Sequence, residues 1–126
     1  KLSKLELELF QAINEKRIRY GKEKYEINLE LSELTEDYHT IMLNDGIDSA
    51  KNKIGSLVER SNSITLDIKN TRESNLKVSK SQAKSGSEIL DSINIYDLYE
   101  PRFNGIAISI IETDTEYNIL IDIFEI

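Results

Sequence analysis

The spacing of apolar residues changes once along this chain of 126 residues, and that change limits the folds it can adopt. Up to about residue 60, apolar residues recur every three or four positions, which is the period of a helix with one buried face. Residues 106–123 instead carry a dense apolar run followed by an alternating one, and both patterns are typical of strands. Helices followed by a strand pair with two covered faces predict a layered α/β sandwich.

Four helices are predicted. They cover residues 2–19, 28–44, 48–60 and 86–93. An S-x-x-E capping box, formed by Ser3 and Glu6, marks the start of the first helix. Asn28 caps the second, since a short polar side chain satisfies free backbone N–H groups at a helix start. The Asp45-Gly46 pair ends that helix.

Three strands are predicted. They cover residues 64–68, 106–111 and 117–123. The last two are separated by a four-residue turn, residues 113–116, and therefore form an antiparallel hairpin. Leu76 and Val78 only hint at a short strand inside the polar stretch 70–80. No internal repeat, low-complexity tract or linker interrupts the chain, so we expect a single domain over residues 1–126.

The formal net charge is −7, and it is unevenly spread. Residues 49–84 carry 8 basic and 3 acidic side chains, whereas residues 87–126 carry 1 basic and 9 acidic side chains. This balance excludes a typical nucleic-acid-binding protein, because affinity for nucleic acid comes largely from neutralising phosphates. The basic stretch is interpreted as a solvated surface, with a patch for an anionic partner or a membrane surface as the alternative.

The chain has no cysteine and one histidine, His39. A disulfide, a thiolate nucleophile and a site needing two imidazoles are therefore all excluded. We expect His39 to be a partly exposed structural side chain, with pH sensing or ligand contact as the alternative. No serine lies in a nucleophile elbow, so no Ser-His-Asp triad is indicated. The residues predict no catalytic site, no metal site and no cofactor.

Two further groups of side chains have a structural and a functional interpretation. The first is Glu112, Asp114 and Glu116, interpreted as a solvated turn rather than a weak Ca²⁺ site. The second is Tyr20, Tyr25, Tyr96 and Tyr99, near the ends of predicted elements. Tyrosine suits both a core edge and a recognition surface, because its ring is rigid and amphipathic. We favour the core edge for this second group.

Residues at both ends of the chain have the order and spacing of a known family. They are Ile13, Asn14, Arg17, Gly21, Asn28, Leu31, Tyr38 and Met42 near the start, and Phe103, residues 106–109 and Phe124 near the end. In this order they resemble the I-N-x-x-R, N-x-x-L and I-G-V-G-type signatures of the CAP superfamily. This superfamily comprises the cysteine-rich secretory, antigen 5 and pathogenesis-related proteins, also called SCP-like domains. The resemblance implies a three-layer α-β-α sandwich, with an antiparallel sheet between helices and a central cleft.

Typical members of that family hold a divalent metal in the cleft with two histidines and two acidic residues, and the present chain departs from this pattern. The family's Gly-Glu-Asn motif aligns with residues 73–75, which places Ser74 at the glutamate position. The positions that stand in place of the metal site are Ser49, Glu73, Ser74, Ile93 and Asn94. The resemblance therefore implies a cleft that these residues line and that has lost its metal.

With these motifs and a composition rich in lysine, isoleucine and asparagine, the chain is similar to outer surface lipoproteins of Borrelia. The resemblance implies a non-enzymatic domain of a bacterial surface lipoprotein, anchored to the outer membrane by a lipid upstream of Lys1. Such a domain is expected to bind a host protein or other macromolecule, or a lipid, and to be a monomer. We find no transmembrane segment. Two alternatives stay open: an intracellular partner-binding or inhibitor protein with an acidic surface, and a hydrolase that uses His39 or a perturbed carboxylate.

Overall fold

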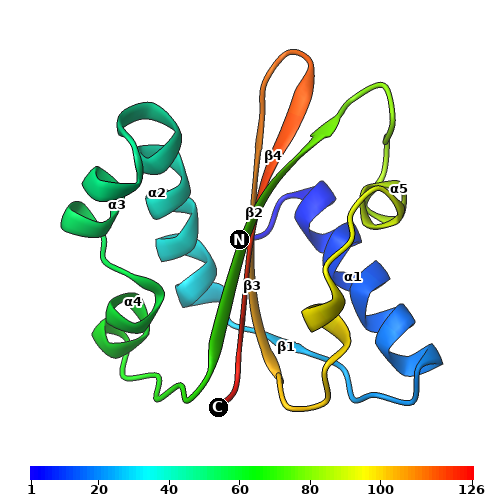
Figure 1. Cartoon of the computed structure of the whole chain (residues 1–126), viewed down its shortest axis with the longest axis horizontal. Helices are drawn as coiled ribbons and strands as arrows, with labels where there is room; N and C mark the ends of the chain where they lie inside the picture. The colour runs from blue at the N-terminus through cyan, green and yellow to red at the C-terminus, as the bar shows by residue number, and fades with distance from the viewer.

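Helices cover both faces of one sheet, which Figure 1 shows edge-on in the middle of the molecule. The computed structural model describes all residues, 1–126. In chain order the elements are α1 (Lys4–Arg19), β1 (Glu26–Ile27), α2 (Leu29–Asp45), α3 (Ile47–Lys53), α4 (Leu57–Ser63), β2 (Thr71–Ser79), α5 (Gly86–Asp91), the short 3-10 helix η1 (Tyr96–Tyr99), β3 (Gly105–Glu112) and β4 (Glu116–Phe124). The expected α-β-α sandwich is confirmed.

The sheet has the strand order β1-β3-β4-β2. The predicted hairpin is present, with β3 and β4 antiparallel and Ile108 opposite Ile121. β2 lies antiparallel on the other side of β4, and the two-residue β1 runs parallel to β3. The hairpin therefore forms the centre of the sheet, and β1 and β2 form its two edges.

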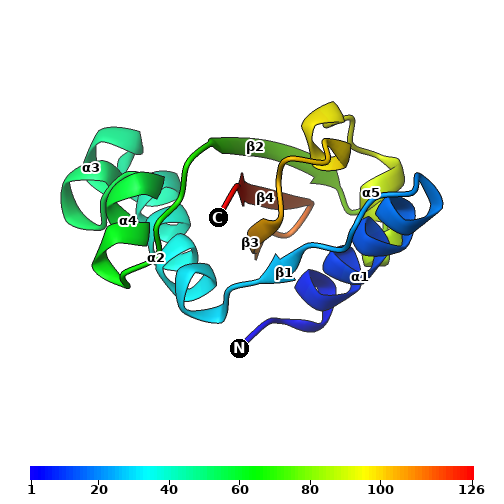
Figure 2. The same cartoon turned by 90° about the horizontal axis from the view of Figure 1, so that it is seen from below.

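Alternation along β4 gives the sheet one apolar and one mixed face. Ile119, Ile121 and their neighbours of odd number belong to a core of 16 buried residues, which includes Leu9 and Ile13 of α1. Residues of even number, Asn118 to Phe124, lie on the side of α2, where two much smaller apolar clusters form. α1, α5 and η1 thus cover the larger apolar core, and α2, α3 and α4 cover the more polar face (Figures 1 and 2).

A buried arginine fastens α1 to the loops around it. The guanidinium of Arg17 donates to the backbone carbonyl oxygens of Glu23, Leu98 and Phe103 at 2.7, 2.7 and 2.9 Å. It also lies 3.9 Å from the centre of the Tyr25 ring. A planar group with five donors suits this role, because it satisfies several carbonyls at once. The arginine of the I-N-x-x-R motif is thus a structural residue here.

Two sequence predictions between residues 48 and 68 are wrong. The single helix predicted over residues 48–60 is divided into α3 and α4, because Gly55 has φ +108° and Ser56 starts a new helix with its own capping box. The strand predicted over residues 64–68 is absent. Thr65 has φ +57° there, and the apolar side chains of this loop pack against the small cluster around Leu31 and Leu57 instead of pairing with a strand.

The stretch that only hinted at a strand is β2, whose nine residues all pair with β4. The sequence gives only a weak strand signal here because most side chains of β2 are polar. On one face of β2 they meet polar partners under α2, and along the outer edge of the sheet they meet solvent. The helices predicted over 2–19, 28–44 and 86–93 are confirmed as α1, α2 and α5. None of the helices has the length and apolar character needed to cross a membrane.

Gly86, at the start of α5, tests how closely α5 approaches α1. A Cβ at this position would collide with the backbone of Glu8 and Leu9. We expect Gly86→Ala to lower the free energy of unfolding by about 1–3 kcal/mol, because the two helices must move apart. Urea unfolding measures this, with the exposed neighbour Ser87→Ala as the control; equal stability of the two variants would contradict the close approach.

Candidate functional site

The single histidine lies in a buried polar cluster between α2 and the sheet. His39 is 0% exposed, so the expected partial exposure is wrong. Its Nδ1 lies 2.8 Å from the Ser109 hydroxyl, and its Nε2 lies 2.7 Å from Oδ1 of Asn118. Because an amide oxygen only accepts, Nε2 carries a proton, and in the neutral ring Nδ1 accepts from Ser109. The Asn75 amide donates to the same Asn118 oxygen at 2.7 Å. Both ring nitrogens are therefore occupied within the protein.

Burial lowers the pKa of His39 below its ordinary value of 6.5, and the hydrogen bond to Asn118 offsets this only in part. The interior thus favours the neutral ring, in which Nε2 donates to Asn118 and Nδ1 accepts from Ser109. An imidazole that is neutral, fully buried and bonded at both nitrogens has no free position for a substrate proton.

A second buried cluster is built around Arg60 of α4. Its Nη2 donates to Oε2 of Glu73 at 2.8 Å and to Oδ2 of Asp122 at 3.0 Å. Its Nη1 donates to the Gly55 carbonyl at 2.8 Å, and its guanidinium lies 4.2 Å from the centre of the Tyr38 ring. One arginine therefore joins α4 and α2 to strands β2 and β4.

The pKa values of the two carboxyl groups in this cluster shift in opposite directions. Burial, followed by the neighbouring Glu73, raises the pKa of Asp122 well above its ordinary value. Burial opposes ionisation of Glu73 as well, but the hydrogen bond from Asp122 and the Arg60 guanidinium outweigh it and lower the pKa of Glu73. Asp122 Oδ2 accepts from Thr35 Oγ1 at 2.9 Å as well as from Arg60, whereas the buried Oδ1 has no hydrogen-bond partner. These directions favour a neutral Asp122 beside the Arg60–Glu73 ion pair.

The five positions that stand in place of the family's metal site are not brought together. Ser49 is on α3, and Glu73 faces α2. Ser74 points to the other face of the sheet, the α1 side, where its partner on β4 is Ile121. Ile93 packs against the larger core, and Asn94 donates to the Tyr96 hydroxyl at 3.2 Å. The sheet therefore separates Ser49 and Glu73 from the other three. In the whole chain, no three His, Asp or Glu side chains are grouped as metal ligands.

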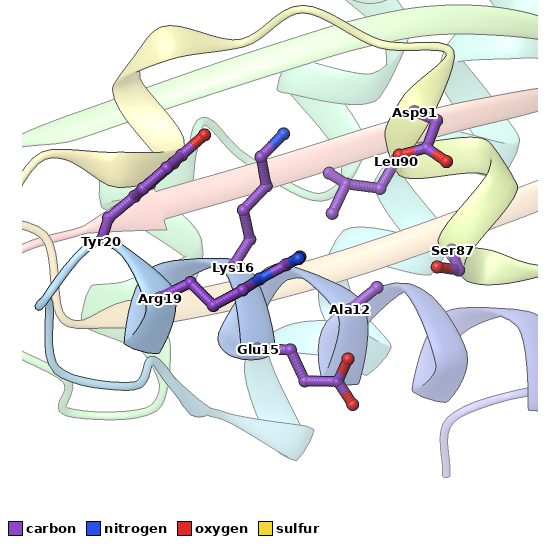
Figure 3. Close-up of a pocket in the computed structure, with 8 residues that line it drawn as sticks. All are labelled: Ala12, Glu15, Lys16, Arg19, Tyr20, Ser87, Leu90 and Asp91. Carbon is purple, nitrogen blue, oxygen red and sulfur yellow. The ribbon is translucent and has the colours of Figure 1, made fainter.

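An open groove lies instead on the other side of the molecule, between α1 and the α5–η1 segment. Two adjoining hollows of about 290 and 320 Å³ share Lys16, Tyr20 and Leu90. We call them together the α1–α5 groove. Its polar half is drawn in Figure 3, where Lys16 and Tyr20 extend from α1 toward the segment after α5. Its other half is mainly apolar and is lined by Tyr20, Leu90, Ile93, Ile95, Tyr96, Leu98 and Tyr99, with Lys16 and Asn94.

The four tyrosines divide between core and surface. Tyr25 is buried and Tyr99 is partly buried, as expected for a core edge. Tyr20 and Tyr96 are 53% and 79% exposed in the groove. The Tyr20 ring meets Tyr99 edge-on with centroids 5.2 Å apart, and Lys16 Nζ lies 5.3 Å from the Tyr99 ring. The sequence indicated the tyrosines as a group, but only the fold shows which two of them form a surface.

The lowered pKa of His39 predicts a pH-dependent stability. Its contribution is fully present above pH 6.5 and is lost as the pH falls from 6.5 toward the lower folded-state pKa, because the unfolded chain then binds a proton that the folded chain excludes. We expect this slope, at most about 1.4 kcal/mol per pH unit, to disappear in His39→Gln. Urea unfolding of both proteins between pH 7.5 and about 5 isolates it, since the carboxylates titrate in both. A slope that persists in the variant would contradict the assignment.

The Arg60 cluster predicts unequal losses for its two fully buried members. Arg60→Met leaves the charge of Glu73 without its partner, and we expect it to lower the free energy of unfolding by about 3–5 kcal/mol. Asp122→Asn replaces a neutral acid by a neutral amide, so we expect less than half of that loss. Urea unfolding at pH 7 compares them. Equal losses would indicate that Asp122 is ionised.

Solved structures share the fold, although no protein-family model and no curated protein matches the sequence. A cysteine-rich secretory protein of Staphylococcus aureus superposes with a TM-score of 0.68 at 14% identity, over 95% of this chain and 38% of that one. An outer surface protein of Borrelia burgdorferi gives 0.66 at 15%, over 93% and 89%. An extracellular protein of Bacillus anthracis with an SCP domain gives 0.67 at 16%, over 95% and 40%. The expected CAP-like fold is thereby confirmed: this chain has the fold of an SCP domain.

Proposed function

We propose that this chain is a non-enzymatic binding domain of a bacterial surface protein, and that the α1–α5 groove binds its ligand. The observation that carries this proposal is the exposure of Tyr20 and Tyr96 beside the apolar floor of the groove. Rigid aromatic side chains supply much of the binding energy in protein interfaces. A ligand that covers these rings would remove a large apolar area from water.

The absence of enzymatic activity is part of the proposal. A hydrolase needs a general base that reaches the substrate. His39 has both nitrogens bonded inside the protein, and Asp122 is fully buried. The strongly shifted groups of the α2 side thus maintain the packing of the sandwich. A metal-dependent reaction is disfavoured because the sheet separates the positions that stand in place of the family's ligands.

A location outside the cell is supported by the three structural neighbours, which are described as secretory, outer surface and extracellular proteins. The chain spans 38% and 40% of two of them but 89% of the outer surface protein. We extend the proposal to a lipid anchor that precedes this domain and holds it to the outer membrane. A lipobox cysteine encoded upstream is the check on this point.

The groove favours a segment of a host protein over a lipid chain. Its floor is apolar, but its rim carries both charges, with Lys16 and Arg19 beside Glu15 and Asp91. A lipid tail needs an enclosed apolar cavity, whereas a peptide with an apolar side chain and flanking polar groups uses a groove of this mixed character. The polar rim then selects the orientation of the peptide.

Tyr96 provides the test, because its hydroxyl contacts only the exposed Asn94. We expect Tyr96→Ser to weaken binding to mammalian serum proteins at least tenfold in biolayer interferometry, without change in stability. Val58→Ser is the matched control, since Val58 is an exposed apolar residue on α4. A photoreactive benzoylphenylalanine at position 96 then identifies the bound protein, with the same group at exposed position 40 as its control.

Three outcomes would contradict the proposal. Equal binding of serum proteins by the Tyr96 and Val58 variants would show that the α1–α5 groove is not the binding site. Saturable binding of palmitate or of phosphatidylcholine vesicles in isothermal titration, lost in Tyr96→Ser, would replace the host protein by a lipid. Stoichiometric binding of Zn²⁺, added as ZnCl₂ in the same instrument, would contradict the proposal that the domain holds no metal.

A further inference from the structure

One edge of the sheet has no strand beyond it. β2 pairs only with β4, and Figure 2 shows no strand beyond it. Two backbone hydrogen bonds show which residues of this segment bond to β4. They run from Lys80 N to the Thr115 carbonyl and from Glu125 N to the Asn70 carbonyl. In an antiparallel ladder the backbone groups of alternate residues point to the same neighbour. Even-numbered residues of β2 thus face β4, and the odd-numbered residues between 73 and 77 present their N–H and C=O groups outward.

These outward residues are accessible. Glu73, Asn75 and Lys77 are all exposed, and Lys77 makes no ion pair within the chain. Glu73 accepts from Arg60 through Oε2, and part of its side chain still reaches solvent. A row of unpaired backbone groups on a strand of this length is a template for another strand. The side chains along the row decide which strand fits.

We propose that two copies of this chain pair through their β2 edges, antiparallel, about a twofold axis that passes beside Asn75. In this register Asn75 lies opposite Asn75 of the second copy, and Glu73 lies opposite Lys77 of the second copy. All these residues have outward backbone groups, so the register forms a complete hydrogen-bonded ladder. Each dimer then contains two Glu–Lys pairs directly across the new seam.

Charge selects this register among those that the backbone allows. A shift by two residues in one direction places Glu73 opposite Asn75, and in the other direction places it opposite Ser79. Neither pairs opposite charges, whereas directly opposed unlike charges stabilise neighbouring strands. The sequence of β2 is thus complementary to itself in one antiparallel register. This differs from the monomer expected from the sequence.

The arrangement has a consequence for the surface. A twofold axis between antiparallel strands is perpendicular to the sheet, so both copies keep their α1 layers on the same side. The two sheets join into one, and two α1–α5 grooves face one way. A single edge contact buries little area, and the dimer is therefore expected to be weak and dependent on concentration. Binding to a repeated ligand would strengthen it.

Lys77→Glu tests the pairing, because it places a second carboxylate opposite Glu73 at both ends of the seam. We expect sedimentation equilibrium to show reversible dimers of the wild type and a dissociation constant at least tenfold higher for Lys77→Glu. Lys69→Glu is the matched control: it makes the same change in net charge at an exposed position outside the register. Circular dichroism checks that both variants fold.

A cross-link gives a second, independent measurement. The chain has no cysteine, so Asn75→Cys carries one thiol, at the axis. Opposed residues of a hydrogen-bonded pair have Cα atoms about 5.5 Å apart, within reach of a disulfide. We expect mild oxidation to yield a disulfide dimer of Asn75→Cys but not of Thr40→Cys on α2.

Four outcomes bear against the paired edge. A monomeric wild type at all concentrations, equal dissociation constants for the two charge variants, or no cross-link would each overturn the proposal. Binding of a foreign strand peptide to a monomeric wild type would overturn it as well, and would reassign the edge to another partner.

Discussion

Arg60 is the interaction on which the α2 side of the sandwich depends. Its guanidinium bonds to Glu73 on β2, Asp122 on β4 and the loop carbonyl of Gly55, and it lies over the ring of Tyr38 on α2. Without it, the partly buried carboxylate of Glu73 would lose its compensating charge. The division of the predicted third helix at Gly55 follows from the same contact, because the chain must turn there to bring Arg60 over the sheet.

The two faces of the sheet contribute differently to the molecule. The α1 side holds the large apolar core, whose burial is the main driving force of folding. The α2 side is held by directional bonds of His39 and Arg60, which specify one arrangement of α2 on the strands. Groups with shifted pKa values usually suggest a functional site. Here the shifted groups of the α2 side are structural, and the surface suited to recognition is on the opposite side.

How far the sequence could predict this structure depends on the distance between partners. Capping boxes and apolar periods are local patterns. They were therefore enough to predict α1, α2, α5 and the hairpin. The partners of His39 are 70 and 79 residues away in the chain, and no local pattern records such contacts. The strand predicted at residues 64–68 fails for a related reason: apolar residues at alternate positions anchor a loop as well as they line a strand, and only the fold decides which.

A single residue step decides the role of the Glu73–Ser74 pair. In a strand, neighbouring side chains point to opposite faces, so an alignment that is uncertain by one position cannot say which face a carboxylate occupies. The family motif places its glutamate at Ser74, which faces the α1 side. The actual carboxylate, one step earlier, faces α2, where it binds Arg60 and still reaches solvent with 30% of its side chain exposed. Glu73 is therefore the one acidic group that joins the buried ion pair to the open edge of the sheet. For that reason, any strand that pairs with this edge will lie beside the Glu73 carboxylate, whose position is already fixed by Arg60.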